Sequence, residues 1–189
     1  MALQFSNVVK AQITQTLLAT LLERGGYRVT RLGIEELFGE IKYLDLSEYM
    51  ALNLPLKLRY LPDLLVADLK MKNAYLVEVK FRLRFDDMSA KLLHQELSVQ
   101  REHWPESHAV IMIAESFVPE GRFHQDYIRI LRPDQTDVLV NSSLPPEEKW
   151  ESLPQVYHVF KNLRKTSLLY NADSITPTLR DLAELQDRL

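Results

Sequence analysis

Apolar residues recur at helical spacing near the start of the chain. Four of them are spaced four residues apart, which places them on one face of a helix: Val9, Ile13, Leu17 and Leu21. Ser6 or Asn7 can cap this helix, and the pair Gly25-Gly26 is typical of a helix C-terminus. The pattern therefore predicts an N-terminal helix that ends just before Gly25.

Three short segments that follow have the length and apolar content of β-strands: residues 27–32, 61–66 and 74–80. The second and third flank a polar stretch, so we expect an antiparallel hairpin. If its turn centres between Met71 and Lys72, Asp63 lies opposite Lys80. A slip of one residue would send Asp63 to the other face of the sheet.

The middle of the chain predicts a second helix and two more strands. Asp86 or Asp87 can cap a helix that runs to Trp104, before Pro105 ends it. Residues 108–114 are almost all apolar, as in a strand buried on both faces, and residues 127–131 form a further candidate strand. The order helix, three strands, helix, strand predicts an α/β fold.

A change in composition near residue 141 predicts a boundary. Residues 141–146 are rich in Asn, Ser and Pro, which favour turns. We therefore expect a core over residues 1–140, and a linker with a helical appendage over residues 141–189. The last helix, opening at Thr176-Pro177, has leucines at helical spacing and can pack on the core or on a second subunit.

Three charged residues interrupt the apolar hairpin: Asp63, Glu78 and Lys80. Charges within apolar strands are costly unless they are used or exposed. Two carboxylates suit a hard cation such as Mg²⁺, which lowers the pKa of a bound water, and a nearby lysine can offset negative charge in a transition state. The alternative is structural: Asp63 is then a turn residue, and Glu78 and Lys80 form a solvated pair.

At these residues the sequence resembles the PD-(D/E)xK nuclease superfamily, the restriction-endonuclease-like phosphodiesterases. The matching pieces are Pro62-Asp63 and Glu78-Val79-Lys80, with fourteen residues between Asp63 and Glu78. The resemblance implies an αβββαβ core with helices on a mixed sheet, and Mg²⁺- or Mn²⁺-dependent cleavage of nucleic acid, with DNA as the expected substrate. It implies Asp63, Glu78 and the Val79 carbonyl as metal ligands, and Lys80 as the residue that positions the attacking water.

The resemblance extends to both predicted helices. In several branches an acid on the first helix joins the metal site, and Glu23 is the residue we carry over; alternatively, Glu23 is a surface residue beside Arg24. Gln100-x-x-x-Trp104 is similar to the Gln-x-x-x-Tyr element of the exonuclease-like branch, which implies that Gln100 supports the active site. This chain has Trp where that branch has Tyr. We expect Glu96 to face solvent.

Basic residues on either side of the motif are candidates for nucleic-acid binding. Arg82 and Arg84 would continue the face of Lys80 if its strand extends, which would give a row of phosphate contacts. The alternative for this row is an edge strand protected by charge. Lys57 and Arg59 alternate with leucines ahead of Asp63, and on a strand they would share one face.

Composition limits the alternatives. The chain has 189 residues, 46% of them hydrophobic, and no cysteine, which excludes disulfides and thiolate metal sites. It has no membrane-length apolar run and no signal-peptide pattern, so we expect a cytoplasmic protein. The net charge of −3 argues against a general nucleic-acid coat protein but allows a local basic groove.

These observations lead us to expect a metal-dependent DNA nuclease. The alternative is a non-catalytic DNA-processing or regulatory module that keeps the nuclease fold. Because nucleases that cut both strands often act as dimers, the resemblance also raises a homodimer as an expectation.

Overall fold

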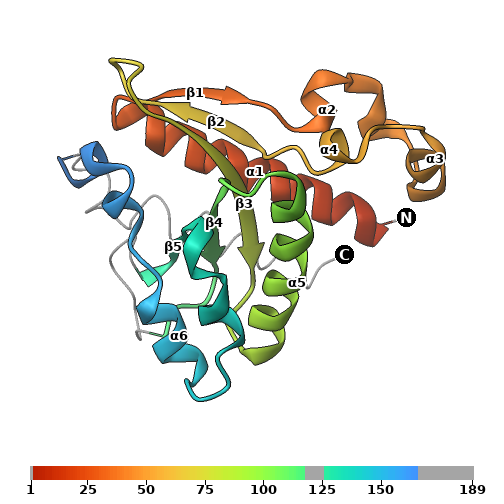
Figure 1. The fold of residues 1–189 in the computed structure, drawn as a ribbon. Helices are drawn as coiled ribbons and strands as arrows, with labels where there is room; N and C mark the ends of the chain where they lie inside the picture. The colour runs from red at the N-terminus through yellow and green to blue at the C-terminus, as the bar shows by residue number, and fades with distance from the viewer. Residues whose placement is uncertain (1, 118–125, 166–189) are drawn as a thin grey trace.

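The computed structural model of the chain describes residues 2–117 and 126–165. In these residues the sheet has five strands, whose spatial order follows the sequence: β1 (Arg28–Arg31), β2 (Leu64–Ala67), β3 (Ala74–Arg82), β4 (His108–Ile113) and β5 (Ile128–Leu131). Neighbouring strands are antiparallel except β3 and β4, which are parallel. The predicted α/β class is therefore confirmed, with a mixed sheet (Figure 1).

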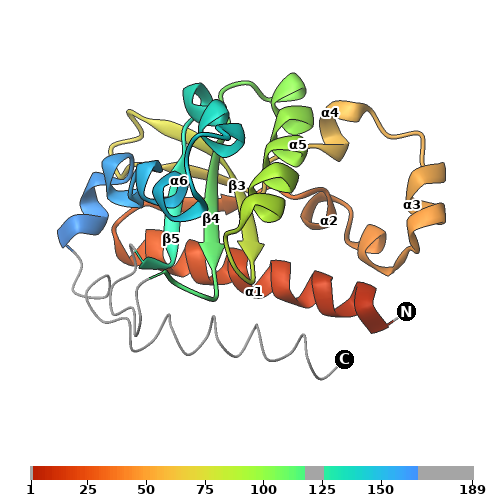
Figure 2. The same cartoon turned by 90° about the horizontal axis from the view of Figure 1, so that it is seen from below.

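Helices cover both faces of this sheet. Helix α1 (Ala2–Arg24) packs on one face, and α5 (Asp87–His103) and α6 (Pro146–Ser152) lie on the other (Figure 2). Alternate residues of β4 divide between the two cores: Val110 belongs to the α1 side and Ile111 to the α5 side. Both residues are fully buried, as expected for a central strand covered on both faces.

The N-terminal helix is longer than predicted. It begins at Ala2, so Ser6 and Asn7 lie inside α1 and do not cap it. Its end follows the prediction, because Gly26 has a left-handed φ of 82° and its N–H donates to the Glu23 carbonyl at 2.9 Å. A side chain at Gly25 would contact the end of the Leu163 side chain, which would have to move to make room.

The register of the β2–β3 hairpin differs from the predicted register by two residues. Leu64 lies opposite Val77, so the pairing extrapolates to Asp63 opposite Glu78 rather than opposite Lys80. The predicted pairing is therefore wrong. A shift of two residues nevertheless preserves the faces of a strand, so Asp63 stays on the side of Glu78 and Lys80.

The turn of this hairpin explains the shift. The Asp68 carboxylate accepts hydrogen bonds from the Lys72 N–H at 2.9 Å and the Asn73 side chain at 2.7 Å. Met71 takes a positive φ of 53°, which a tight turn requires. These contacts centre the turn between Lys70 and Met71, one residue earlier than predicted.

An insertion of short helices separates β1 from β2 and projects beyond one end of the sheet (Figure 1). It contains α2 (Ile34–Leu37), η1 (Gly39–Tyr43), α3 (Leu46–Ala51) and α4 (Leu56–Arg59). Lys57 and Arg59 therefore lie on a helix, and the condition under which they would share a face is not met. On a helix these two residues lie about 200° apart, so they do not share a face. The Trp104 indole donates to the Lys57 carbonyl at 3.0 Å and ties α4 to α5.

The chain after β5 is irregular but well packed. It contains η3 (Pro133–Val140), α6, η4 (Val156–His158) and η5 (Lys161–Lys165). Six of its apolar side chains are buried in the two cores: Leu139, Trp150, Leu153, Val156, Phe160 and Leu163. The described part of residues 141–189 thus packs on the sheet and its helices. The predicted final helix from Thr176 lies outside the described residues.

In the described ranges, no helix has the length and apolar character needed to cross a membrane.

Candidate active site

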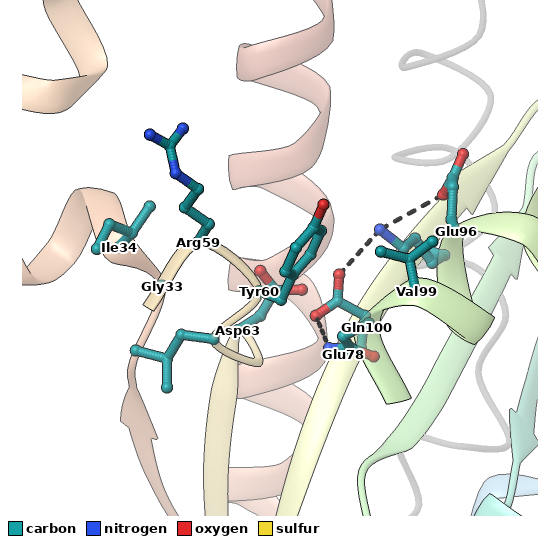
Figure 3. A pocket seen from close by; sticks show the side chains of 11 residues that line it. Gly33, Ile34, Arg59, Tyr60, Asp63, Glu78, Glu96, Val99 and Gln100 are labelled. Atoms are coloured by element: carbon teal, nitrogen blue, oxygen red, sulfur yellow. Dashed lines mark hydrogen bonds and ion pairs between the residues drawn. The ribbon is translucent and has the colours of Figure 1, made fainter. Parts of the chain in front are cut away.

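A pocket of about 380 Å³ lies between the start of β2, the middle of β3 and helix α5 (Figure 3). Its lining includes the four residues predicted for metal binding or catalysis, Asp63, Glu78, Lys80 and Gln100, and also Arg59, which was predicted to bind nucleic acid. Asp63 lies just before β2, Glu78 and Lys80 lie on β3, and Gln100 lies on α5, so the fold brings together side chains that are up to 37 positions apart in the sequence.

Asp63 is held in place by hydrogen-bond donors on both carboxylate oxygens. Its Oδ1 accepts a hydrogen bond from the Gln15 amide of α1 at 2.7 Å, and its Oδ2 accepts one from the Val79 N–H at 2.7 Å. Gln15 is only 9% exposed. The Asp63 carboxylate is therefore fixed between helix α1 and strand β3.

Glu78 is held in the same manner from the other side. Its Oε2 accepts from the Gln100 amide of α5 at 2.6 Å, and its Oε1 lies 2.8 Å from the Lys80 ammonium. The Gln100 carbonyl oxygen in turn accepts from the Ser107 hydroxyl at 3.3 Å. Both ends of this buried amide are thus paired, as burial of an amide requires.

Lys80 and Arg82 share an acidic partner on α5. The Glu96 carboxylate lies 3.4 Å from the Lys80 ammonium through Oε2 and 2.6 Å from the Arg82 guanidinium through Oε1. Glu96 is exposed, as expected, but its carboxylate also lines the pocket, which was not predicted. Figure 3 shows Glu96 and Glu78 on the same side of the pocket, joined through a common cation.

These contacts set the protonation of the pocket. Burial acts to lower the pKa of Lys80, but attraction by Glu78, its hydrogen bond and the charge of Glu96 outweigh this and raise the pKa above its ordinary value. Burial acts to raise the pKa of Glu96, but Arg82 and Lys80 bring it below its ordinary value. Near neutral pH, Lys80 is therefore a cation and hydrogen-bond donor, not a base.

Two predicted residues lie away from this pocket. Glu23 is exposed in the last turn of α1, about 12 Å along the helix axis from Gln15. Gln15, and not Glu23, is the α1 residue that contacts Asp63. Arg84 follows the end of β3, is 67% exposed and pairs with Asp86 at 2.9 Å, so the predicted row of basic residues on one strand stops at Arg82.

The insertion places its two basic residues differently. Lys57 is exposed on α4. Arg59 lines the pocket, but its guanidinium donates to the carbonyls of Tyr49, Met50 and Leu52. Figure 3 shows this guanidinium pointing away from Glu78. Arg59 therefore holds α3 against α4.

The oxygen atoms of the pocket fit a hard divalent cation. Asp63 and Glu78 both line the pocket, and carboxylate oxygens are the ligands that a hard cation such as Mg²⁺ prefers. The Val79 carbonyl points to the same side of β3 as the N–H that reaches Asp63. Across the described ranges, no group of three or more Asp, Glu, His or Cys side chains is arranged for a metal ion. Mg²⁺, however, commonly takes one or two carboxylates and keeps several waters.

Gln15 and Glu96 line or support the site but were not predicted from the sequence. The position of each on its helix could nevertheless have indicated it. Gln15 lies three and seven positions before the buried residues Leu18 and Leu22, so it shares their helical face. Glu96 lies four positions before Gln100 and therefore shares the face of α5 that reaches β3. A polar residue on an otherwise buried helical face would have identified Gln15, and the spacing of four residues from Gln100 would have identified Glu96.

Comparisons with known proteins give this chain no family. No protein-family model, no curated protein and no solved structure matches it. The function of the pocket must therefore be argued from its own residues.

Proposed function

We propose that the protein is a metal-dependent nuclease that hydrolyses DNA phosphodiester bonds on a restriction-endonuclease-like core. The observation that carries this proposal is that Asp63, Glu78 and Lys80 line one pocket, with each carboxylate oriented by a buried glutamine. The element order α1, β1, β2, β3, α5, β4 agrees with the αβββαβ core of such nucleases and supports the proposal.

The proposal gives each residue a role. Asp63, Glu78 and the Val79 carbonyl would hold Mg²⁺ or Mn²⁺, while Gln15 and Gln100 keep the carboxylates in position. A bound ion would supply positive charge at the phosphate and a water of lowered pKa. Protonated Lys80 donates a hydrogen bond to the attacking water or to a phosphate oxygen, which stabilises the negative charge that develops there.

Arg82 is the cation best placed to extend this site along a nucleic-acid backbone. It follows Lys80 by two residues on β3, and both cations meet the same face of α5. Neutralising phosphates with such cations releases counterions and supplies affinity without reading sequence. Lys57 and Arg84 are exposed where a longer strand could reach them, although Arg84 pairs with Asp86, whereas Arg59 is engaged within the insertion.

The test is cleavage of end-labelled single- and double-stranded DNA, and of matched RNA, with Mg²⁺, with Mn²⁺ and with EDTA. We expect the wild type to cut DNA only with metal, and Asp63→Asn to lose cutting by at least roughly a thousandfold, because the substitution removes a ligand charge while keeping the side-chain shape. The control is Glu102→Gln, which neutralises an exposed acid on α5.

Thermal unfolding followed by circular dichroism checks that both variants fold. Cutting that persists in folded Asp63→Asn would refute the assignment of this site. A folded wild type that binds nucleic acid but cuts none would instead favour the non-catalytic module, and preferential cutting of RNA would change the substrate class.

A further inference from the structure

The Glu96 carboxylate joins two cations that the proposed nuclease needs for phosphate binding. One oxygen contacts Arg82 at 2.6 Å and the other contacts Lys80 at 3.4 Å. The two oxygens therefore span the two cations, as two non-bridging oxygens of one phosphate would. In the described part of the chain, Lys80 and Arg82 are the partners of this carboxylate.

Glu96 differs from the two proposed metal ligands in how it is held. Asp63 and Glu78 each accept a hydrogen bond from a buried glutamine, and the Glu78 side chain is only 13% exposed. The Glu96 side chain is 43% exposed and is held by the two cations. It can therefore rotate into solvent without disturbing the carboxylates of the pocket.

The energetics favour exchange with a phosphate. Ion pairs of partly exposed side chains contribute little net free energy, because solvent competes for both charges. A backbone phosphate that enters from a polyanionic strand replaces both contacts at once, and the release of counterions along the strand adds to its affinity. An isolated anion lacks this second contribution.

We propose that Glu96 is an internal counter-anion that occupies the phosphate position between Lys80 and Arg82 and is displaced by the backbone of nucleic acid. This inference rests on the proposed function and adds a means of regulation to it. With Glu96 in place, the site disfavours single phosphates and small anions. A strand with several phosphates displaces the carboxylate, so the site binds polymeric nucleic acid in preference to single phosphates.

The test is a double-substitution cycle on DNA binding without metal. Four proteins are compared with a fluorescently labelled single-stranded oligonucleotide in EDTA, by anisotropy: wild type, Glu96→Gln, Arg82→Gln and the double variant. We expect Glu96→Gln to bind roughly tenfold more tightly than the wild type, because the freed cations make charge-assisted bonds to phosphate. For this variant, the slope of log affinity against log salt concentration should become steeper by about 0.7 for each phosphate contact that is added on a single strand.

The cycle separates displacement from simple repulsion. If Glu96 acts by occupying Arg82, most of the gain disappears in the Arg82→Gln background, since the two substitutions then share one interaction. If Glu96 only repels DNA, the gain is the same in both backgrounds and the proposal is overturned. Glu102→Gln, on the same helix, gives the effect of removing an exposed acid elsewhere, and we expect it to be less than about twofold.

Failure of this inference can be told from failure of the nuclease proposal. If the wild type cuts DNA with metal but Glu96→Gln binds no more tightly than Glu102→Gln, the counter-anion is refuted and the nuclease stands. If the wild type does not cut but the expected cycle is observed, the displaceable anion stands as part of a binding site. If no variant binds DNA and the wild type does not cut, both proposals fall.

Discussion

The two faces of strand β3 differ sharply, although alternate residues of one strand form them. On the α1 side, Val77 is completely buried among leucine and isoleucine side chains. On the α5 side, Glu78, Lys80 and Arg82 carry charge and remain 13 to 23% exposed. One strand thus contributes both to the hydrophobic core and to the lining of a polar pocket.

Helix α5 makes this division possible. Its residues Leu93 and Leu97 are fully buried in the core on β4, whereas Glu96 and Gln100 reach the charged face of β3. In the proposed nuclease, the α1 face of β3 therefore contributes to stability and its charged face to catalysis. Substitutions on the α1 face of β3 should therefore change folding, and substitutions on its α5 face should change activity.

Lys80→Met should give the largest difference between the effect on activity and the effect on stability. The substitution keeps the length of the side chain but removes its charge. We expect metal-dependent cleavage to fall by roughly a hundred- to a thousandfold, the usual effect of removing one group that stabilises developing charge. The melting temperature should stay close to that of the wild type. Lys91→Met, an exposed lysine on α5, is the control. A large loss of stability with unchanged cleavage would reverse the roles given to the two faces.

The opposite result is expected for Val77→Ala on the buried face. Removing two methyl groups from a fully buried site should lower the free energy of unfolding by about 2 kcal/mol. For a chain of this size, we expect the melting temperature to fall by about 4–8 °C in circular dichroism. Cleavage at a temperature well below melting should be almost unchanged, and a strong loss there would show that the two faces are coupled.

Gln15→Leu tests whether the amide on α1 positions Asp63. We expect about a tenfold loss of metal-dependent cleavage, because residues that orient metal ligands commonly have effects of this size. The metal concentration for half-maximal activity should rise, which a merely structural role would not predict. Gln12→Leu changes an exposed glutamine one turn earlier and should have no effect on that concentration.

The smallest effect is expected in the pH dependence of stability at Glu96. Its folded-state pKa lies below the ordinary value of 4.5, so ionised Glu96 stabilises the folded protein above that pH. This contribution disappears as the pH falls through the folded-state pKa. Urea unfolding should therefore show wild type more stable than Glu96→Gln by less than about 1 kcal/mol at neutral pH. The difference should shrink in acid, and growth of the difference in acid would contradict the assigned ion pairs.

The sequence predicted the elements of the core because their patterns are long or strongly apolar. The alternation of charges with apolar residues also placed Asp63, Glu78 and Lys80 on one face, which depends only on the period of a strand. The register was wrong because the turn is fixed by side-chain bonds of Asp68, which hydrophobic pattern does not reveal. The face was nevertheless right, since the error was an even number of residues.

Short segments and contacts between elements were less predictable. Residues 56–60 alternate like a strand, but over five residues a helical turn has no distinct signature. The long-range bond from Trp104 to the Lys57 carbonyl ties this helical turn to α5. The ion pairs of Glu96 were not predicted because its partners lie on another element, and only the packing of α5 on β3 brings them together.

The contact between Tyr27 and residues near the end of the described chain affects how the protein can be synthesised. The Asn162 N–H donates to the Tyr27 hydroxyl at 3.2 Å across 135 residues, and Phe160 packs edge-on against the same ring at 5.4 Å between centroids. Synthesis on the ribosome proceeds from the N-terminus, so α1 and the first strands emerge long before Phe160 and Leu163 can cover them. The nascent chain must therefore carry an uncovered apolar surface through most of its translation, and premature termination before residue 160 should yield an aggregation-prone fragment that depends on chaperones.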